Sequence, residues 1–336
     1  MKDKFKNLLV TGGAGFIGSN FINYILNKYD SINIHNIDNL TYAGNLDNTK
    51  SFVNNPRYKF HKGDICDSEF LKKIFKDYMI DGVINFAAES HVDNSISSPE
   101  IFIKTNILGV YNLLNISYNS WMDGPFKKKK YFMHSRFHQI STDEVYGSIE
   151  NGSFSEQSTY NPSSPYSSSK ASADMIVKSF FVTYGLNTTI SVSSNNFGPN
   201  QHSEKLLPKS IISIVKKKPV IIYGDGLNIR DWIFVEDNCK AIDIIFNKGN
   251  SGESYNIASK VELTNNDLIN KIKNIISEYT DINFEIKYIK DRPGHDRRYS
   301  LNISKMRDEF GWIPSQNFEH FLRSYIINKL EKLRNE

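Results

Sequence analysis

The chain has few of the features that mark secreted, membrane-embedded or metal-binding proteins. It contains two cysteines, Cys66 and Cys239, which stand at no spacing typical of a disulfide framework or a metal site. We therefore expect reduced thiols, a cytoplasmic location and no bound metal. No segment approaches the ~20 consecutive apolar residues that cross a membrane, and the first apolar run is brief, so neither membrane insertion nor secretion is expected.

Excess charge and low-complexity sequence are also scarce. The formal net charge is +4, and the conspicuous basic run, Lys127 to Lys130, follows Gly124 and Pro125 as a solvated loop would. We therefore expect no nucleic-acid partner. Internal repeats and flexible linkers are not evident, whereas 336 residues with 39% hydrophobic content can form a sizeable core.

Short apolar, β-branched runs alternate with amphipathic stretches in the first half of the chain. The runs are NLLV, INIHNID, GVINFAA, FHQIST and TTISVSS. Strands that alternate with helices predict an α/β fold with a Rossmann-type, doubly wound parallel sheet. Near Asn195 the sequence becomes rich in turns, which predicts a smaller, interleaved C-terminal lobe for the substrate. We assign residues 1–192, completed by part of 222–260, to the first domain, which carries the Rossmann-type sheet. Residues 193–336 belong mainly to the second domain.

The clearest ligand signal is a glycine loop directly after the first predicted strand. In TGGAGFIG, Gly12, Gly15 and Gly18 stand between NLLV and the amphipathic SNFINYIL. Such glycines allow a tight turn and let the backbone approach a pyrophosphate at a helix N-terminus. Asp38 ends the second predicted strand about 20 residues later, the spacing of a carboxylate that binds an adenosine ribose. Its charge would repel a 2′-phosphate, which favours NAD over NADP, although Asp38 alone would also fit a turn or helix cap.

A tyrosine and a lysine lie four residues apart in NPSSPYSSSKASAD. Tyr166 and Lys170 would share one face of a helix that begins after Pro165. An ammonium beside a phenol lowers the phenol pKa from about 10, so the tyrosine could act as a base near neutral pH. Such pairs are usually surface neighbours. Together with a dinucleotide loop, however, this pair suits hydride transfer from an alcohol, which requires removal of a hydroxyl proton.

Three adjacent polar residues, Thr142, Asp143 and Glu144, follow an apolar run in ISTDEVYG. A parallel strand that ends there places them at the edge where doubly wound sheets bind ligands. Neighbouring side chains of a regular strand face opposite sides, so both carboxylates can serve one substrate only if the backbone turns at Asp143 and Glu144. In a desolvated cleft their pKa values should separate into an acid and a base, which suits elimination of water. Taken alone, the triplet would fit a solvent-facing capping turn better than an active site.

With these motifs the chain resembles the nucleotide-sugar 4,6-dehydratases of the extended short-chain dehydrogenase/reductase superfamily, most closely the dTDP-glucose 4,6-dehydratases. The matching segments span nearly the whole chain and are TGGAGFIGSN, LTYAGN, FAAESHVDNSI, ISTDEVYG, SPYSSSKASAD, SNNFGP, EKLLP, YGDGLNIRDWIFVED, YNIAS, DRPGHDRRY and FGWIP. The resemblance implies an enzyme of deoxysugar biosynthesis that forms a homodimer through helices. It also implies that the first domain binds NAD and the second binds the sugar nucleotide.

The implied reaction converts dTDP-glucose to dTDP-4-keto-6-deoxyglucose in three steps. Tyr166, assisted by Lys170 and with Thr142 bonded to the sugar hydroxyl, would remove the C4 hydroxyl proton as hydride passes from C4 to NAD⁺. Glu144 would then take the C5 proton while Asp143 protonates the departing C6 hydroxyl. Hydride would finally return to C6, so the cofactor should stay bound throughout turnover.

The resemblance also implies two sets of ligand contacts. The cofactor contacts would be Gly12, Gly15, Phe16, Ile17, Gly18, Asp38, Asn39, Leu40, Thr41, Asp64, Ile65, Phe86, Ala87, Ala88, Glu89, Ser90, Thr105, Tyr166, Lys170 and Asn196. The contacts of the nucleoside-diphosphate glucose would be Ser90, Thr142, Asn195, Lys205, Leu206, Leu207, Tyr223, Arg230, Asn265, Arg292 and His295. The two arginines and the histidine are charge-assisted donors suited to a diphosphate, although an ion-paired surface loop would also explain DRPGHDRRY.

Three alternatives stay open. Ile221 stands where the family commonly has a proline near the base pocket, and a methyl group in an apolar pocket changes affinity by only ~1–3 kcal/mol, so UDP-glucose is an alternative substrate. A sugar-nucleotide 4-epimerase would share the fold, NAD and the Tyr166/Lys170 pair, but it needs no acid and base for dehydration. A non-catalytic sugar-nucleotide-binding protein would need neither this acid and base nor the Tyr166/Lys170 pair.

Overall fold

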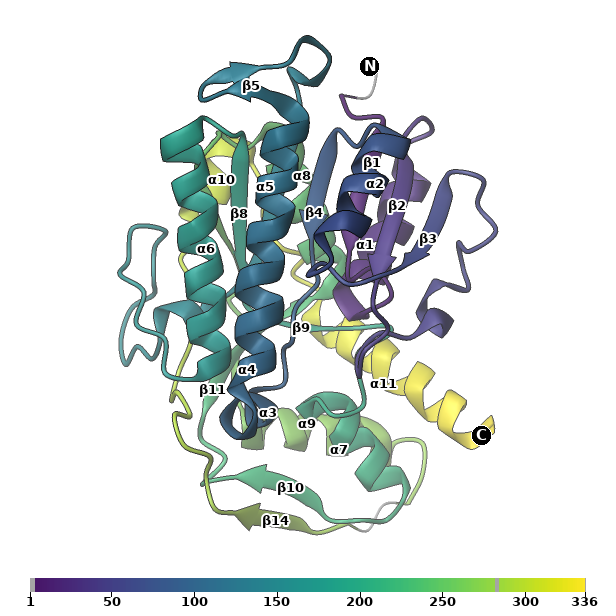
Figure 1. Cartoon of the computed structure of the whole chain (residues 1–336). Coiled ribbons are helices and arrows are strands. Elements are labelled where there is room, and N and C mark those ends of the chain that lie inside the picture. The colour runs from purple at the N-terminus through teal and green to yellow at the C-terminus, as the bar shows by residue number, and fades with distance from the viewer. Residues whose placement is uncertain (1–3, 282–283, 336) are drawn as a thin grey trace.

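The computed structural model describes residues 4–281 and 284–335, and its largest element is a seven-stranded parallel sheet with the strand order β12-β8-β7-β4-β1-β2-β3 (Figure 1). The strands are β1 (Asn7–Thr11), β2 (Asn33–Asp38), β3 (Tyr58–Lys62), β4 (Gly82–Asn85), β7 (Arg136–Thr142), β8 (Thr188–Ser193) and β12 (Ser254–Ile257). All neighbouring strands pair in parallel. The predicted doubly wound α/β fold is confirmed.

Helices cover both faces of this sheet, which explains why its central strands are almost continuously buried. One face carries α2 (Ser68–Tyr78), α5 (Val110–Trp121) and α6 (Pro165–Tyr184). The other carries α1 (Phe16–Lys28) and α8 (Val235–Lys248). Between β4 and α5 the chain forms α3 (Val92–Ser97), α4 (Pro99–Phe102) and a π-helical segment, Ile103–Gly109.

A second lobe lies beyond one end of the sheet (Figure 1). Its strands are β9 (Asn195–Phe197), β11 (Ile229–Phe234) and β13 (Glu262–Thr264) in one sheet, and β10 (Val220–Tyr223) and β14 (Ile286–Ile289) in another. Its helices are α7 (Leu206–Val215), α9 (Asn265–Ser277) and α11 (Phe318–Asn335). They enclose an apolar core separate from that of the large sheet. Because β12 pairs with β8, the chain returns to the large sheet, and the lobes are interleaved.

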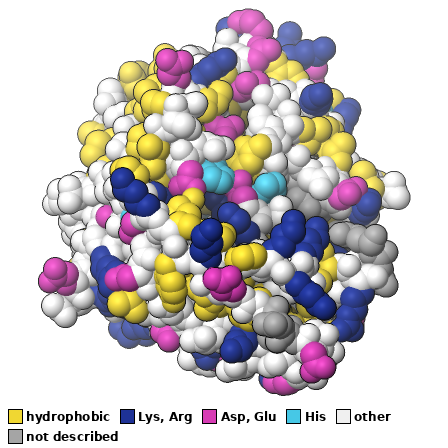
Figure 2. Space-filling view, turned by 90° about the horizontal axis from the view of Figure 1, so that it is seen from below, with side chains coloured by type: hydrophobic (Ala, Val, Ile, Leu, Met, Phe, Trp, Pro, Cys, Tyr) yellow, Lys and Arg dark blue, Asp and Glu magenta, His cyan; other side chains and the backbone are white. Residues whose placement is uncertain are grey.

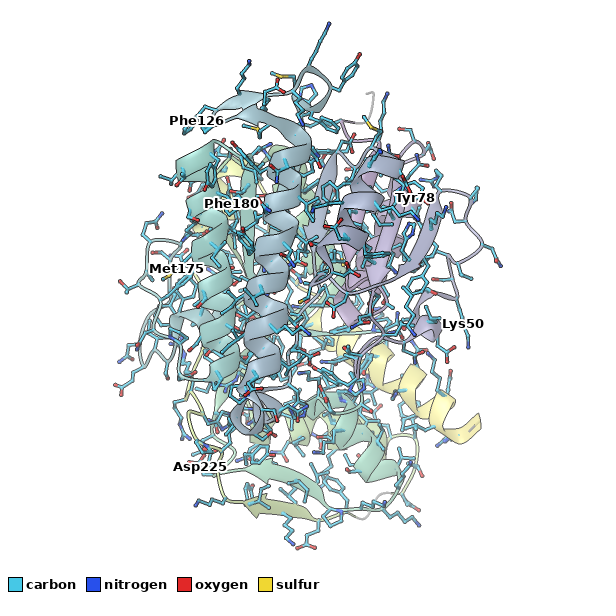
Figure 3. The ribbon with its side chains drawn as sticks, in the orientation of Figure 1. Lys50, Tyr78, Phe126, Met175, Phe180 and Asp225 are labelled. Atoms are coloured by element: carbon cyan, nitrogen blue, oxygen red, sulfur yellow. The ribbon has the colours of Figure 1, made fainter. Side chains whose placement is uncertain are left out.

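Smaller elements complete the chain. They are the 3₁₀ turns Leu46–Thr49, Lys130–Phe132 and Asp143–Tyr146, the hairpin of β5 (Met122–Gly124) and β6 (Lys127–Lys128), and α10 (Ser304–Phe310). Figure 3 shows Phe126 at the hairpin end of the molecule and Asp225 at the opposite end, in the second lobe. Across residues 4–281 and 284–335, no helix combines the length and apolar character needed to span a membrane.

Arg136 ties the start of β7 to the end of α8. Its buried guanidinium donates from Nη1 to the carbonyl oxygens of Ile245 at 3.0 Å and Phe246 at 2.8 Å, and from Nε to Asn187 Oδ1 at 3.1 Å. The last carbonyls of a helix have few partners within it, and Arg136 supplies a donor to that of Phe246. The Ile245 carbonyl also accepts the N–H of Gly249 at 2.8 Å.

We expect Arg136→Met to lower the free energy of unfolding by about 3 kcal/mol, because it removes the arginine donor from the buried Phe246 carbonyl and from Asn187 Oδ1. Urea denaturation measures the loss. Arg323→Met is the matched control, since Arg323 pairs with Glu278 at the surface, where removal costs about 1 kcal/mol or less. Equal losses in the two variants would contradict the role of Arg136.

Candidate active site

A cavity of about 520 Å³ lies where the carboxyl ends of the large sheet meet the second lobe. Parallel strands of a doubly wound sheet place their ends, and hence their ligands, on this side. Figure 2 views the molecule from this end and shows histidine, acidic and basic side chains gathered near the middle of the face.

The cavity brings together most of the residues named from the sequence. The cofactor set contributes Gly12, Gly15, Phe16, Ile17, Gly18, Asp38, Asn39, Thr41, Asp64, Ile65, Phe86, Ala87, Ala88, Glu89, Ser90, Thr105, Tyr166, Lys170 and Asn196. The substrate and catalytic sets contribute Thr142, Glu144, Asn195, Lys205, Leu206, Tyr223, Arg230, Asn265, Arg292 and His295.

Three of the named residues do not line the cavity. Leu207 is fully buried in the apolar core of the second lobe, because it lies on the inner face of α7. Leu40 occupies a left-handed turn with φ of 55°, and its backbone N–H donates to Asp38 Oδ1. Asp143 is buried behind the cavity wall.

The glycine loop has the shape that a pyrophosphate requires. Gly12 has φ of +69°, and a Cβ there would lie 2.7 Å from Ala87 N. A Cβ on Gly18 would lie 2.4 Å from the Gly12 oxygen. Helix α1 begins at Phe16, and no described side chain caps its first N–H groups. These amides are therefore available to an anion at the helix N-terminus, so the loop fits a dinucleotide.

Asp38 both positions the loop and faces the cavity. Its Oδ2 accepts the N–H of Ala14 at 2.9 Å, and its Oδ1 accepts the N–H of Leu40 at 2.8 Å. Burial raises the pKa of the carboxyl group. Each carboxylate oxygen retains a free acceptor site, so Asp38 can cap the turn and still receive ribose hydroxyls.

The backbone turns at the end of β7, as the paired carboxylates require. Thr142 ends the strand, and a 3₁₀ turn over Asp143–Tyr146 follows at once. Thr142 Oγ1 accepts the N–H of Glu144 at 3.4 Å and donates to Asp143 Oδ1 at 3.3 Å. Glu144 lines the cavity, while Asp143 lies beneath it, with Oδ2 lacking a partner among the described residues.

The surroundings of the two carboxyl groups differ in charge. Burial raises both pKa values, and repulsion from Glu144 raises that of Asp143 further, well above its usual range. Three cations, Arg292, Arg230 and Lys205, oppose the rise in the pKa of Glu144. Arg230 and a hydrogen bond from Thr142 oppose the rise in the pKa of Asp143. Of the two groups, Asp143 therefore holds a proton more strongly and Glu144 ionises more readily.

Tyr166 and Lys170 lie buried on the first turns of α6. A capping box formed by Ser164 and Ser167, with Pro165 at the first helical position, sets the start of this helix. Lys170 Nζ donates to the Ile140 oxygen at 2.5 Å, which joins α6 to β7 just before the Thr142 turn.

The prediction that the pKa of Tyr166 lies below its usual value of about 10 is wrong. Burial and the nearby Glu144 charge raise the pKa of Tyr166 well above 10, and the hydrogen bond with Thr142 acts against them to a smaller extent. Burial also lowers the pKa of Lys170 to about 8, and its ammonium is engaged by a backbone carbonyl. In this site desolvation therefore outweighs the attraction that the four-residue spacing suggested.

The second lobe supplies the cationic side of the cavity. The Cζ atom of the buried Arg230 lies 4.2 Å from the centre of the Tyr299 ring. Its Nη2 donates to the main-chain carbonyl oxygen of Asp296 at 2.9 Å. Arg292 Nη1 lies 3.5 Å from Asp93 Oδ1, and Tyr223 OH donates to Asp93 Oδ2 at 2.9 Å. Two fixed guanidinium groups on one wall suit a diphosphate.

Sequence reasoning missed several residues of this cavity. Asp93 holds Arg292 and Tyr223 across the lobes, and His91 Nε2 lies 3.3 Å from Glu204 Oε2. The segments FAAESHVDNSI and EKLLP contain these residues and were used for the family resemblance, but no role or partner was assigned to them. Their partners are between one and two hundred residues away in the chain, so no spacing rule could have paired them.

Comparisons with known proteins agree with this geometry. A family model described as GDP-mannose 4,6 dehydratase matches residues 9–325. The chain is 48% identical to the dTDP-glucose 4,6-dehydratase of Haemophilus influenzae over 333 residues, which cover 95% of this chain and 96% of that protein.

Solved structures give the same result. The dTDP-glucose 4,6-dehydratase of Bacillus anthracis in complex with NAD is 43% identical, with a TM-score of 0.84 over 97% of this chain and 96% of that chain. The enzyme of the same name from Streptomyces venezuelae, with NAD and TYD bound, is 36% identical, with a TM-score of 0.89 over 98% of each chain.

We expect Gly18→Ala to weaken NAD binding by about tenfold or more, because its Cβ would push α1 away from the Gly12 oxygen at a cost of ~1–3 kcal/mol. Calorimetric titration with NAD⁺ measures the effect. Gly124→Ala is the control, since a Cβ there meets no atom within 4 Å. Unchanged affinity in Gly18→Ala would contradict the placement of the pyrophosphate at this loop.

Proposed function

The chain belongs to the GDP-mannose 4,6-dehydratase family, with dTDP-glucose 4,6-dehydratases among its relatives, and on this premise we propose that it is an NAD-dependent enzyme that converts dTDP-glucose to dTDP-4-keto-6-deoxyglucose. The observation that carries the proposal is the pair of carboxyl groups at the end of β7. Asp143 is buried and keeps its proton, and Glu144 faces the cavity among cations. Elimination of water needs such an acid and such a base in one site.

Oxidation at C4 requires removal of the hydroxyl proton. Tyr166 is the base for this proton, and Thr142 hydrogen-bonds both the phenol and, in the proposed complex, the sugar hydroxyl. The residues of the glycine loop with Asp38 would hold NAD, which supplies the hydride acceptor at C4 and the hydride donor at C6. Because burial raises the pKa of Tyr166, this step needs a positive charge near the phenol, and Lys170 is the cation that the protein places one helical turn away.

Loss of water follows at C5 and C6. A C5 proton becomes acidic once C4 is a ketone, and Glu144, ionised beside Arg292, Arg230 and Lys205, removes it. Asp143 donates its proton to the C6 hydroxyl, because hydroxide is otherwise a poor leaving group. A sugar-nucleotide 4-epimerase would share the fold and Tyr166 but would have no use for this pair, so the dehydratase is favoured.

The preference between thymine and uracil in the substrate nucleotide is a separate, more specific proposal. We infer a preference for dTDP-glucose over UDP-glucose, supported by the relatives' activities and by an apolar stretch of the cavity that includes Ile221, Ile222, Leu206 and Trp232. A thymine methyl group gains from such surroundings, but only by ~1–3 kcal/mol. UDP-glucose is therefore expected to be a poorer substrate and not an excluded one.

Location, assembly and domain division also belong to the proposal. We place the enzyme in the cytoplasm, as a homodimer formed through α5 and α6. The support for this dimer interface is that α5 and α6 expose the side chains of Tyr111, Met175 and Val182. Residues 1–192, completed by part of 222–260, would form the NAD-binding domain, and 193–336 would form most of the sugar-nucleotide domain. The pairing of β12 with β8 supports the completing segment.

Incubation with NAD⁺ and either dTDP-glucose or UDP-glucose tests the function. We expect a 4-keto-6-deoxy sugar, read by its alkaline absorbance and by NMR, with a higher kcat/KM for dTDP-glucose. A 4-epimer without keto product would overturn the dehydratase assignment in favour of an epimerase. Inactivity on both substrates would favour a non-catalytic binding protein.

Glu144→Gln should retain C4 oxidation but slow exchange of the C5 proton with D₂O by about 100-fold or more, because an amide cannot accept that proton. Asp143→Asn is the matched variant and should retain C5 exchange while slowing loss of the C6 hydroxyl. NMR of the recovered sugars separates the steps. Unchanged C5 exchange in Glu144→Gln, or equal slowing of all steps in Asp143→Asn, would show that the roles are misassigned.

A further inference from the structure

Asp174 is a fully buried carboxyl group next to the active site that none of the proposed steps uses. It lies on α6 four residues after Lys170, as Lys170 lies four residues after Tyr166. This spacing puts the three side chains on one face of the helix, one above another. The face therefore carries a phenol, an ammonium and a carboxylate in sequence, inside the protein.

Hydroxyl groups from other elements hold one oxygen of this carboxylate. Ser141 Oγ, on β7, donates to Asp174 Oδ2 at 2.5 Å, and Tyr160 OH, from the loop before α6, donates to the same oxygen at 3.1 Å. Oδ1 is buried and has no hydrogen-bond partner among the described residues. A carboxylate held in this way cannot turn out to solvent, and its charge stays on the inner face of α6.

Lys170 needs such a partner. Its side chain is 5% exposed, and its one hydrogen bond within the described residues goes to the neutral carbonyl of Ile140. A buried ammonium with only neutral partners tends to lose its proton. Asp174 is the charged group that acts on Lys170, and the attraction is mutual, since Lys170 also lowers the pKa of Asp174 against the effect of burial.

We propose that Asp174 is a positioning residue that keeps Lys170 charged one helical turn from Tyr166, with Ser141 and Tyr160 holding the carboxylate in place. The inference rests on the proposed dehydratase function and deepens it. Tyr166 is buried beside the negative charge of Glu144, so forming its phenolate requires a nearby cation. Asp174 acts through Lys170 and does not line the cavity that would hold substrate and cofactor.

The charge of Lys170 depends on every group that faces this column. Around Lys170 lie Tyr166 and Asp174 on α6 and the Ile140 carbonyl on β7. Around Asp174 lie Lys170 and Lys178 on α6, Ser141 on β7, and Tyr146 and Tyr160 from the segments before α6. Burial holds the pKa of Lys170 at about 8 and that of Asp174 at about 6. Between these values both groups are charged. Loss of Asp174 should therefore move the deprotonation of Lys170 to lower pH.

Asp174→Asn removes the charge and keeps the shape. NMR titration of the protein labelled with ¹³Cε-lysine reports the protonation of Lys170 directly, once Lys170→Met has assigned its resonance. We expect the Lys170 midpoint to fall by about one pH unit or more. We also expect the alkaline limb of the C4 oxidation rate to move down with it, so that the loss of rate relative to the unaltered enzyme is largest above pH 8.

Asp243→Asn is the matched control. Asp243 is likewise a buried aspartate, and it forms an ion pair with Lys28 of α1, but it lies away from the cavity. It should reduce stability to a similar degree and leave the Lys170 titration and the pH profile unchanged. A merely structural role for Asp174 predicts the same behaviour in both variants.

An unchanged Lys170 midpoint in Asp174→Asn would overturn the proposal, as would equal shifts in the two variants. If Asp174→Asn does not fold, Asp174→Ser retains a hydroxyl for the same partners and should show the same shift. The titration needs no turnover, so it decides the role of Asp174 even if the protein forms no 4-keto sugar. That latter result would count against the proposed function alone.

Discussion

Repulsion between Asp143 and Glu144, inside a site that excludes water, is the constraint around which this protein is arranged. Two buried carboxylates at one strand end cannot both ionise unless cations are brought to them. The second lobe brings those cations, and it places more of them near Glu144 than near Asp143. The difference in proton occupancy that dehydration requires therefore depends on how the two lobes meet.

The same logic governs α6. In the proposed reaction Tyr166 gives up a proton in surroundings that resist negative charge, and Lys170 keeps one in surroundings that resist positive charge. Under our proposal Asp174 offsets the second cost. Each charge is expensive alone, and each becomes tolerable through its neighbour one helical turn away. The hydroxyl groups of Ser141 and Tyr160 extend this column of partners to β7 and to the preceding loop.

Sequence patterns predicted the parts of the site that are close together in the chain. Gly12, Gly18 and Asp38 belong to one βαβ unit, so motif spacing was sufficient to find them. The turn at Asp143 was predicted from the need to aim two adjacent side chains at one cavity. The structure has the turn, but of the two carboxyl groups it is Glu144 that lines the cavity, while Asp143 is buried behind it. Patterns did not show that Leu207 faces the core, because that depends on which side of α7 packs against the second lobe.

The chain by itself determined the doubly wound sheet, the glycine loop and the placement of Tyr166 and Lys170 on one helix face, because local periodicity and short spacings encode all three. Only the tertiary structure decided which carboxyl group keeps a proton and whether Lys170 can lower the pKa of Tyr166. Both depend on burial and on charges contributed by distant segments, such as Arg230 and Arg292. Electrostatic energies vary with separation in space and with exclusion of water, and separation along the chain reveals neither.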